Sequence, residues 1–414
     1  MTASPARRIT VGALALLATT ALTGCHMSSK RNIRTLGKTF SYLKDPALRA
    51  KEKGDARLVV EGAELSGERF EGMDWHNILF KNCDFVGAYE INPKTATNVR
   101  YEDCRFSGIL SYGVTTNVHF LRCTWVANSL MFAEKGSKST VFEECNFVGT
   151  TANRNHQGGV GSDGEATFVR CTAKWFTWTG EEKLSITDCT CEDLTIDTDH
   201  IGSSGENFLY STIRIEGSKL RGTFEMVAIN LQSLTIRDTV IDTLDLTGTT
   251  IKEELLMERV RGGSVEAVVK GAKRLAVRDS QFTPPASGGK FAFSLASDDA
   301  QEVLIENTSI LGDNILVDIG GGPHTESLVF RKSKFSRLDL QYAHAKHLLL
   351  QDFEANSVRL NDARIGKLEM NSAVFALTLD LSNTQVHEFK KTGGTNLTKL
   401  GGLKLDGSNI HLPQ

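Results

Sequence analysis

The chain has 414 residues, with 47 lysines and arginines against 50 aspartates and glutamates, and a formal net charge of −3. This mild balance lacks the basic stripe that nucleic-acid-binding proteins carry, so we expect no nucleic acid among the partners. The sequence also contains no nucleophile motif, Walker loop, HExxH or dinucleotide fingerprint. We therefore expect a protein that is not an enzyme, with no cofactor and no bound metal.

The first 24 residues have the composition of a signal peptide. Arg7 and Arg8 precede an apolar stretch, residues 9–22, that is too short and wrongly flanked to span a membrane comfortably. The letters LTGC that end at Cys25 resemble a bacterial lipobox. That resemblance implies cleavage before Cys25, acylation of its thiol and new amine, and attachment to the lipid bilayer, and His26 favours the outer membrane, facing the periplasm. An ordinary signal peptide with an accidental cysteine is the alternative.

Residues 25–56 are predicted to form a tether and a capping segment. Basic residues cluster there, the apolar Ile33, Leu36, Phe40 and Leu43 fall at helical spacing, and Asp45 before a proline marks a break. We expect a short amphipathic helix that covers the exposed edge of the repeats that follow. A basic segment that rests on anionic headgroups near the lipid anchor is the alternative.

A five-residue repeat occupies residues 57–414. Residues 328–377 make ten units without a break, in which the third residue is apolar and the first is apolar or small. The same phase is found in 58–87 and in 234–258, where it assigns Glu254 and Leu256 as one inward pair, and it continues after a one-residue slip to Ile410. Neither an α-helix nor a flat strand repeats every five residues. Four units make a coil of about 20 residues, and coils of this kind stack into a solenoid.

These units resemble those of the pentapeptide-repeat family, which centre on a bulky apolar residue with a small residue two positions before it. The resemblance implies an all-β fold, a right-handed parallel β-helix of quadrilateral cross-section, over most of residues 58–410. Many first positions here hold Leu, Val or Phe rather than Ala or Cys, which predicts a wider or less square cross-section. Because the repeat is continuous, we expect one elongated domain rather than the two or three that length alone suggests.

Six cysteines share the first position of a unit, and their separations of 21, 19, 22, 26 and 18 residues place one in each coil: Cys83, Cys104, Cys123, Cys145, Cys171 and Cys189. We expect them to stack as a ladder inside the solenoid, where cysteine packs as a small apolar residue. Equivalent contexts further on hold Ser218, Thr239, Ser280, Thr308 and Ser333. A metal site is disfavoured because a ladder forms a line rather than a converging set of ligands. Disulfides between neighbouring rungs remain an open alternative.

Interruptions of the repeat mark surface loops, and the longest covers residues 153–164. Loops on a rigid scaffold commonly carry function. Shortly after it, the phase of the repeat directs Phe176 and Trp178 inward and Trp175 outward, where an indole can stack on a sugar or anchor a protein. The predicted binding residues are Arg154, Asn155, His156 and Trp175. A simple insertion without function is the alternative.

Together these features predict a non-catalytic lipoprotein of the cell envelope. Its solenoid would bind or scaffold a macromolecular partner, either an envelope protein or a polysaccharide. One alternative is an immunity lipoprotein that neutralises a toxin arriving in the periplasm. Another is a polysaccharide lyase or hydrolase, for which Asp197, Asp199 and His200 are the nearest cluster of suitable side chains.

Overall fold

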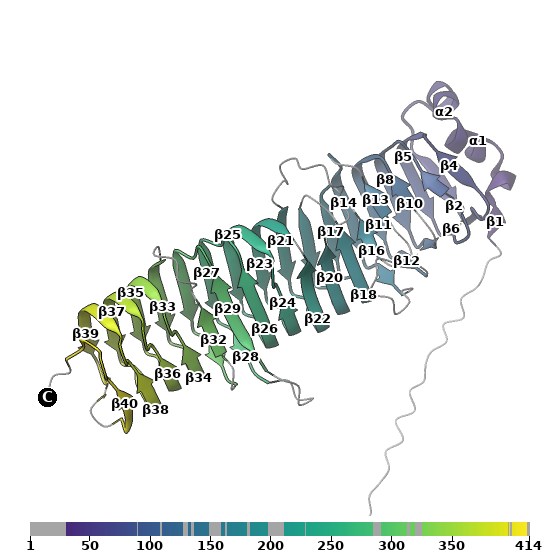
Figure 1. The fold of residues 1–414 in the computed structure, drawn as a ribbon. Coiled ribbons are helices and arrows are strands. Elements are labelled where there is room, and N and C mark those ends of the chain that lie inside the picture. Colours follow the sequence, from purple (N-terminus) through teal and green to yellow (C-terminus); the bar gives the residue numbers. More distant parts are fainter. Residues whose placement is uncertain are drawn as a thin grey trace, which may run out of the picture.

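The chain coils into a parallel β-solenoid, an elongated rod with two short helices at one end (Figure 1). The computed structural model describes residues 30–411 except 89, 108–109, 127–130, 134–135, 149–158, 162–163, 180–182, 198–210, 228, 285–290, 313–314, 319–324, 396 and 398–399. The segment with Cys25 lies outside these residues. The all-β solenoid expected from the repeat is confirmed.

Two long parallel sheets and one short sheet form the walls of the rod. Sheet 1 has 16 strands, namely β2 (Leu58–Glu61), β5 (Asp74–Lys81), β8 (Thr95–Glu102), β11 (Val114–Leu121), β14 (Lys138–Glu143), β17 (Ala166–Val169), β19 (Leu184–Thr187), β21 (Ser211–Glu216), β23 (Asn230–Arg237), β25 (Thr250–Glu258), β27 (Arg274–Arg278), β30 (Glu302–Glu306), β33 (Thr325–Arg331), β35 (His344–Gln351), β37 (Arg364–Asn371) and β39 (Gln385–Thr392). Each of these strands comes from the coil that follows the previous one in the chain.

Sheet 2 has 20 strands, namely β1 (Arg31–Asn32), β3 (Ala63–Glu64), β6 (Asp84–Phe85), β9 (Arg105–Phe106), β12 (Thr124–Trp125), β15 (Asn146–Phe147), β16 (Gly159–Gly161), β18 (Thr172–Thr179), β20 (Thr190–Asp197), β22 (Lys219–Val227), β24 (Val240–Asp245), β26 (Arg261–Val269), β28 (Gln281–Phe282), β29 (Phe293–Ser297), β31 (Ser309–Ile310), β32 (Ile315–Asp318), β34 (Lys334–Asp339), β36 (Glu354–Arg359), β38 (Val374–Asp380) and β40 (Gly402–Lys404). Sheet 3 has four strands, β4 (Arg69–Glu71), β7 (Glu90–Asn92), β10 (Leu110–Tyr112) and β13 (Met131–Ala133). With adjacent strands about 4.8 Å apart, the 16 strands of sheet 1 make a rod about 70 Å long.

The register confirms the length of the coil and the phase of the repeat in 328–377. His344 lies opposite Arg364 in the next coil, a step of 20 residues. Every first and third position of the ten units is buried except Phe375, which is partly buried. No coil buries these side chains alone, because each is covered by the coils above and below it.

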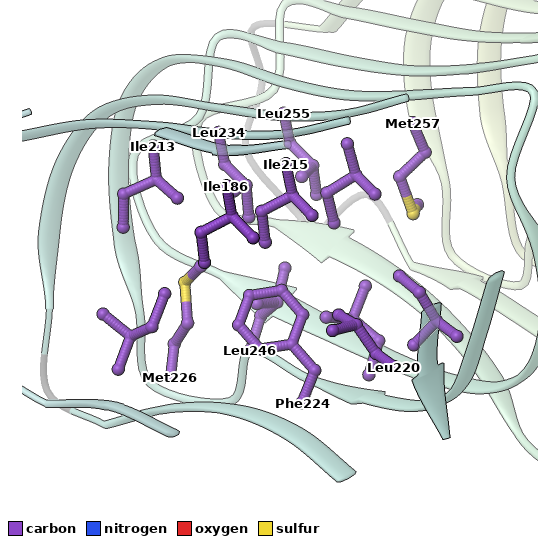
Figure 2. Close-up of a cluster of buried hydrophobic side chains, with 14 of the residues drawn as sticks. Ile186, Ile213, Ile215, Leu220, Phe224, Met226, Leu234, Leu246, Leu255 and Met257 are labelled. Atoms are coloured by element: carbon purple, nitrogen blue, oxygen red, sulfur yellow. The ribbon is translucent and has the colours of Figure 1, made fainter. Parts of the chain in front are cut away.

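The inward pair predicted at Glu254 and Leu256 is wrong by one residue. Leu234 pairs with Leu255, and the register shifts between Leu231 and Ser233 because β25 carries an extra residue. The inward side chains of β25 are therefore Leu255 and Met257, which face the side chains of sheet 2 across the interior (Figure 2).

Aromatic side chains fill the first half of the interior in two stacked columns. In the column from sheet 1 the ring centroids are 4.6–5.0 Å apart and the planes within 4–6° of parallel. This column consists of Phe80, Tyr101, Phe120, Phe142 and Phe168. Its spacing matches the spacing of the strands, so the backbone and the rings stack with a common period.

A left-handed backbone residue turns each coil from sheet 1 into sheet 2. The non-glycine residues at this corner have φ between +48° and +54°. We call them the corner row: Asn82, Asp103, Arg122, Glu144, Arg170, Asp188, Asp238, Arg259, Asp279, Asn307, Lys332, Asp352 and Ser372. Gly62, Gly217 and Gly393 take this position in other coils. An L-residue in this conformation costs roughly 1–2 kcal/mol, which the stacked neighbours must outweigh.

The residue after each corner is the ladder position, and the cysteine ladder is confirmed there. All seven cysteines among the described residues are buried and free of disulfides. Small size is not the only property required at this position, because the ladder side chain also forms hydrogen bonds with the backbone. The Ser218 hydroxyl donates to the Glu216 carbonyl at 2.9 Å and accepts the Cys189 N–H of the previous coil at 3.1 Å. In the same way the Cys189 sulfur accepts the Cys171 N–H at 3.3 Å.

Two helices cover the first coil, where the apolar spacing near the N-terminus predicts a single short helix. They are α1 (Lys38–Lys44) and α2 (Pro46–Lys53), preceded by the short 3₁₀ turn η1 (Ile33–Leu36). The break at Asp45 divides the expected single helix, because its carboxylate caps α2 by accepting the Leu48 N–H at 2.9 Å. None of the helices in the described part of the chain is long and apolar enough to cross a membrane.

Basic side chains of this cap are largely engaged by the solenoid. The buried Arg49 guanidinium donates to the carbonyls of Ala56 at 3.0 Å and Asn77 at 2.9 Å, and also to that of His76. Lys44 lies 3.9 Å from the buried Glu68 carboxylate of the first coil. These contacts satisfy polar groups at the exposed end of the first coil, which is the role expected of a cap.

Candidate functional site

The loop predicted to bind a partner lies largely outside the described residues, which include neither Arg154, Asn155 nor His156. Trp175 belongs to β18, although its side chain is outside the description. Phe147 lies opposite Ala173, and Gly159 lies opposite Thr177. The backbone of 174–176 therefore lies between the two positions that pair with the described residues on either side of the insertion. The binding patch itself stays a prediction, as does the cluster at Asp199 and His200, which are also undescribed.

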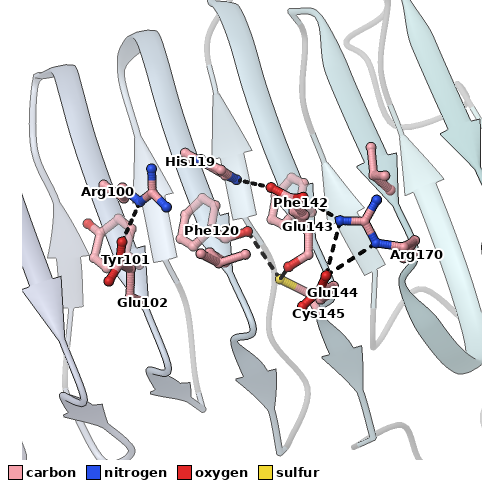
Figure 3. Close-up of polar contacts among 12 residues, drawn as sticks. Arg100, Tyr101, Glu102, His119, Phe120, Phe142, Glu143, Glu144, Cys145 and Arg170 are labelled. Carbon is pink, nitrogen blue, oxygen red and sulfur yellow. Dashed lines mark hydrogen bonds and ion pairs between the residues drawn. The ribbon is translucent and has the colours of Figure 1, made fainter.

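A network of charged side chains crosses the outer face of sheet 1 (Figure 3). Arg100 lies 2.6 Å from Glu102, and Arg170 lies 3.0 Å from Glu144. The His119 Nε2 lies 3.0 Å from a Glu143 oxygen, an ion-pair distance without hydrogen-bond geometry. Burial lowers the pKa of His119, and the charge of Arg100 lowers it further. Surface ion pairs of this kind contribute at most about 1 kcal/mol each to stability. We therefore interpret the network as an ordinary solvated face of the sheet and not as a functional site.

A polar groove of about 780 Å³ follows the corner row over five consecutive coils. Four strand spacings make it roughly 19 Å long. Its lining comes from the corner row, from the ladder position and from the first outward residue of sheet 2. The lining residues are Asp238, Thr239, Val240, Arg259, Arg261, Asp279, Ser280, Gln281, Asn307, Thr308, Ser309, Lys332 and Lys334.

Neighbouring side chains determine which groups in the groove are free to bind. Arg259 at one end is held by Asp238, with N–O distances of 2.6 and 2.9 Å. This contact lowers the pKa of Asp238, and hydrogen bonds to Asp238 and Glu258 raise the pKa of Arg259. In the centre, the Asn307 amide donates to the Asp279 carboxylate at 2.7 Å. Both carboxylates of the groove are thus already engaged.

Two cations of the groove have no such partner. Among the residues that the structure describes, neither Arg261 nor Lys332 has a carboxylate oxygen within 4.0 Å. They lie three coils apart, which is about 14 Å along the rod. Lys334 lies beside Lys332 and contacts Glu354 at 3.2 Å. The groove therefore presents an unpaired cation in its second coil and another in its fifth, with uncharged amide and hydroxyl groups, including Gln281, between them.

An apolar void of about 10 Å³ lies inside the rod, where the aromatic columns end. Its lining includes Cys171, Cys189 and Cys191. Burial raises the pKa of Cys191 to about 12, so this thiol stays protonated at neutral pH. The void is no larger than one water molecule requires, and aromatic, aliphatic and cysteine side chains line it. Within the described ranges, no three His, Cys, Asp or Glu side chains are arranged to share a metal ion.

The sequence carries a signal for the groove beyond the five-residue period. Each corner-row residue can be located in the sequence, because it directly precedes a ladder position. In the groove, the short side chains of Asp279 and Asn307 lie between the longer basic side chains of neighbouring coils. Comparisons of the chain with family models, with curated proteins and with solved structures found no match in any of the three.

Proposed function

We propose that this protein is a non-catalytic binding module of the bacterial cell envelope. A lipid on Cys25 would anchor it to the outer membrane on its periplasmic side, and the solenoid would bind a macromolecular partner. The corner groove carries this proposal, because an open polar groove roughly 19 Å long suits an extended chain better than a small metabolite.

The state of the groove's carboxylates supports a binding role over catalysis. A lyase or hydrolase needs an acid or base that is free to exchange a proton with its substrate. Asp238 is paired with Arg259, and Asp279 accepts a hydrogen bond from Asn307. The contact that lowers the pKa of Asp238 favours its ionised form, which makes it a poor general acid at neutral pH.

The geometry of the rod suits a module that projects from a surface. The described residues begin at Lys30, five positions after Cys25, and the helical cap lies at this end (Figure 1). Eight coil spacings separate the corner at Gly62 from the one at Asp238, where the groove begins, a distance of roughly 38 Å. An N-terminal lipid anchor would thus leave the groove well clear of the headgroups.

Two measurements test the proposal. Cys25→Ser should move the protein from the membrane fraction to the soluble periplasm, and its retention in membranes after a high-salt wash would reject the anchor. The full chain in detergent should retain an envelope component that the double variant Arg261→Gln, Lys332→Gln does not retain. Arg364→Gln is the matched control, because Arg364 is exposed and lies outside the groove. If wild type retains nothing, the binding role is wrong; if only Trp175→Ala abolishes retention, the partner binds the loop patch instead.

A further inference from the structure

We infer that the corner groove binds an acidic polysaccharide, a chain of sugar residues bearing carboxylates, laid parallel to the axis of the rod. This inference rests on the proposed binding function and specifies its ligand. The first support is the cation pattern. Arg261 and Lys332, about 14 Å apart, are both exposed and have no ion-pair partner among the described residues. A neutral ligand would leave this positive charge unused.

The centre of the groove is suited to hydroxyl groups. Gln281 and Ser309 supply an amide and a hydroxyl group in two successive coils. Such side chains both donate and accept hydrogen bonds, as sugar hydroxyls do. Arg261 and Lys332, one coil on either side of these groups, can donate charge-assisted hydrogen bonds to carboxylates, which are stronger than neutral ones. The lining thus has separate groups for the two kinds of oxygen that an acidic sugar chain carries.

The period of the solenoid also fits a polymer. Corner, ladder and sheet 2 positions recur in every coil, about 4.8 Å apart, so an extended polymer laid along the groove meets the same three kinds of position repeatedly. A ligand that advances by one residue per coil meets equivalent positions in register. Five coils contribute to the groove, so it would hold a short run of residues within a longer chain.

Other classes of macromolecule fit the lining less well. Bases of single-stranded nucleic acid stack on aromatic side chains, and the groove has none. Protein interfaces centre on aromatic or large apolar anchors, whereas Val240 is the groove's only large apolar residue among those described. An acidic peptide shares the charge of the proposed ligand and therefore serves as a comparator in the test.

The test measures binding of fluorescently labelled oligouronate, about eight residues long, to the full chain in detergent at low salt. A neutral oligoglucan of the same length and a polyglutamate of the same charge are the competitors. We expect displacement by unlabelled oligouronate alone, and weaker binding as salt is added. Arg261→Gln and Lys332→Gln should each weaken binding about tenfold or more, as expected for a lost hydrogen bond to a charged group. Arg364→Gln should bind like wild type, and all three variants should unfold at the wild-type temperature.

The outcomes separate this inference from the proposed function. If oligouronate does not bind while the chain still retains an envelope component, the ligand class is wrong and the binding role stands. Equal displacement by polyglutamate would also overturn the glycan assignment, since charge alone would then explain binding. If the oligouronate binds but both groove variants bind it like wild type, the site lies elsewhere and the inference fails.

Discussion

Single residues at the corner decide whether each coil can close. The corner residue adopts a left-handed conformation, and the ladder residue after it provides the hydrogen bonds that the turn would otherwise leave unmade. These two requirements explain which residue types recur at each position, which packing alone does not. Asn, Asp and Gly recur at the corner, and Cys, Ser and Thr recur at the ladder. Asparagine and aspartate tolerate the left-handed region better than most residues, and glycine does so without penalty.

Asp352 isolates the backbone cost of the corner, because it is exposed and its side chain makes no hydrogen bond or ion pair within the described part of the chain. Asp352→Val should lower the free energy of unfolding by about 1–3 kcal/mol, since a β-branched residue is strained at positive φ. Asp352→Gly should be tolerated, within about 0.5 kcal/mol of wild type or slightly stabilising. Urea denaturation measures both. Equal stability of the valine variant and wild type would contradict a left-handed corner.

Ser218 tests the hydrogen-bonding role of the ladder. Ser218→Ala leaves the buried Cys189 N–H without its acceptor and should cost about 1–3 kcal/mol. Ser218→Cys is the matched control, because cysteine fills this position in six other coils and its sulfur accepts the equivalent N–H. We expect the cysteine variant to lie much closer to wild type in thermal unfolding. If the alanine variant is as stable as the cysteine variant, the hydrogen bond to the ladder side chain does not contribute to stability and the position acts through packing only.

His119 predicts one component of the pH dependence of stability. Burial and Arg100 lower its pKa in the folded chain below the ordinary value of 6.5. As pH falls through that value, the unfolded chain takes up the proton before the folded chain does, so acidification favours unfolding. The free energy of unfolding of wild type should therefore fall more steeply between pH 7.5 and pH 5.5 than that of His119→Gln. If the free energy of unfolding falls more steeply in His119→Gln than in wild type, the pKa of His119 is raised in the folded chain and the prediction is wrong.

At the scale of strands, the five-residue period specifies much of what the structure contains. It predicts the inward side chains of β33 to β37, the cysteine ladder and the buried Phe176 and Trp178. It fails at β25, where one extra residue shifts the phase without leaving a gap in the apolar pattern. The groove was not predicted, because concavity depends on side-chain lengths in five coils that lie far apart in the sequence.

Trp178 in β18 tests the packing of one strand against the interior. It is fully buried, and its indole nitrogen has no hydrogen-bond partner within the described residues. Trp178→Ala should lower the free energy of unfolding by about 3–5 kcal/mol through the cavity that it leaves. Trp178→Phe should cost only about 1–2 kcal/mol, since it keeps an aromatic ring and removes an unpaired N–H. If Trp178→Phe lowers the free energy of unfolding as much as Trp178→Ala does, the assignment of an indole N–H without a hydrogen-bond partner is wrong.

At the scale of the molecule, stability is shared along a line of nearest neighbours. Each coil contacts the one before and the one after, so the rod resembles other repeat proteins in which the stabilities of units and interfaces add. The helical cap closes the first coil, whereas at the other end Asn409 takes the place of one strand residue by bonding both polar groups of the Val386 backbone at 2.9 Å. The two ends are therefore protected by different devices.

Removal of one whole coil tests this modular architecture. Deletion of residues 344–363 joins Ala343 to Arg364, which already occupies the equivalent place one coil later. The shortened chain should keep its strand content and unfold in a single transition within a few degrees of wild type. Deletion of residues 344–353 is the control, since it removes half a coil and places a strand of sheet 2 where sheet 1 belongs. Collapse of both variants alike would contradict independent coils.

The direction of the inter-strand hydrogen bonds determines how the rod responds to a pulling force. In the described sheets these bonds run along its length, so tension applied between its two ends would pull each coil directly away from its neighbour. Strand bonds loaded in this way open one after another instead of resisting together. Each coil that opens releases about 20 residues, or roughly 70 Å of extended chain. A lipid-anchored rod of this kind would therefore yield in steps under load, lengthening the link before the anchor is drawn out of the membrane.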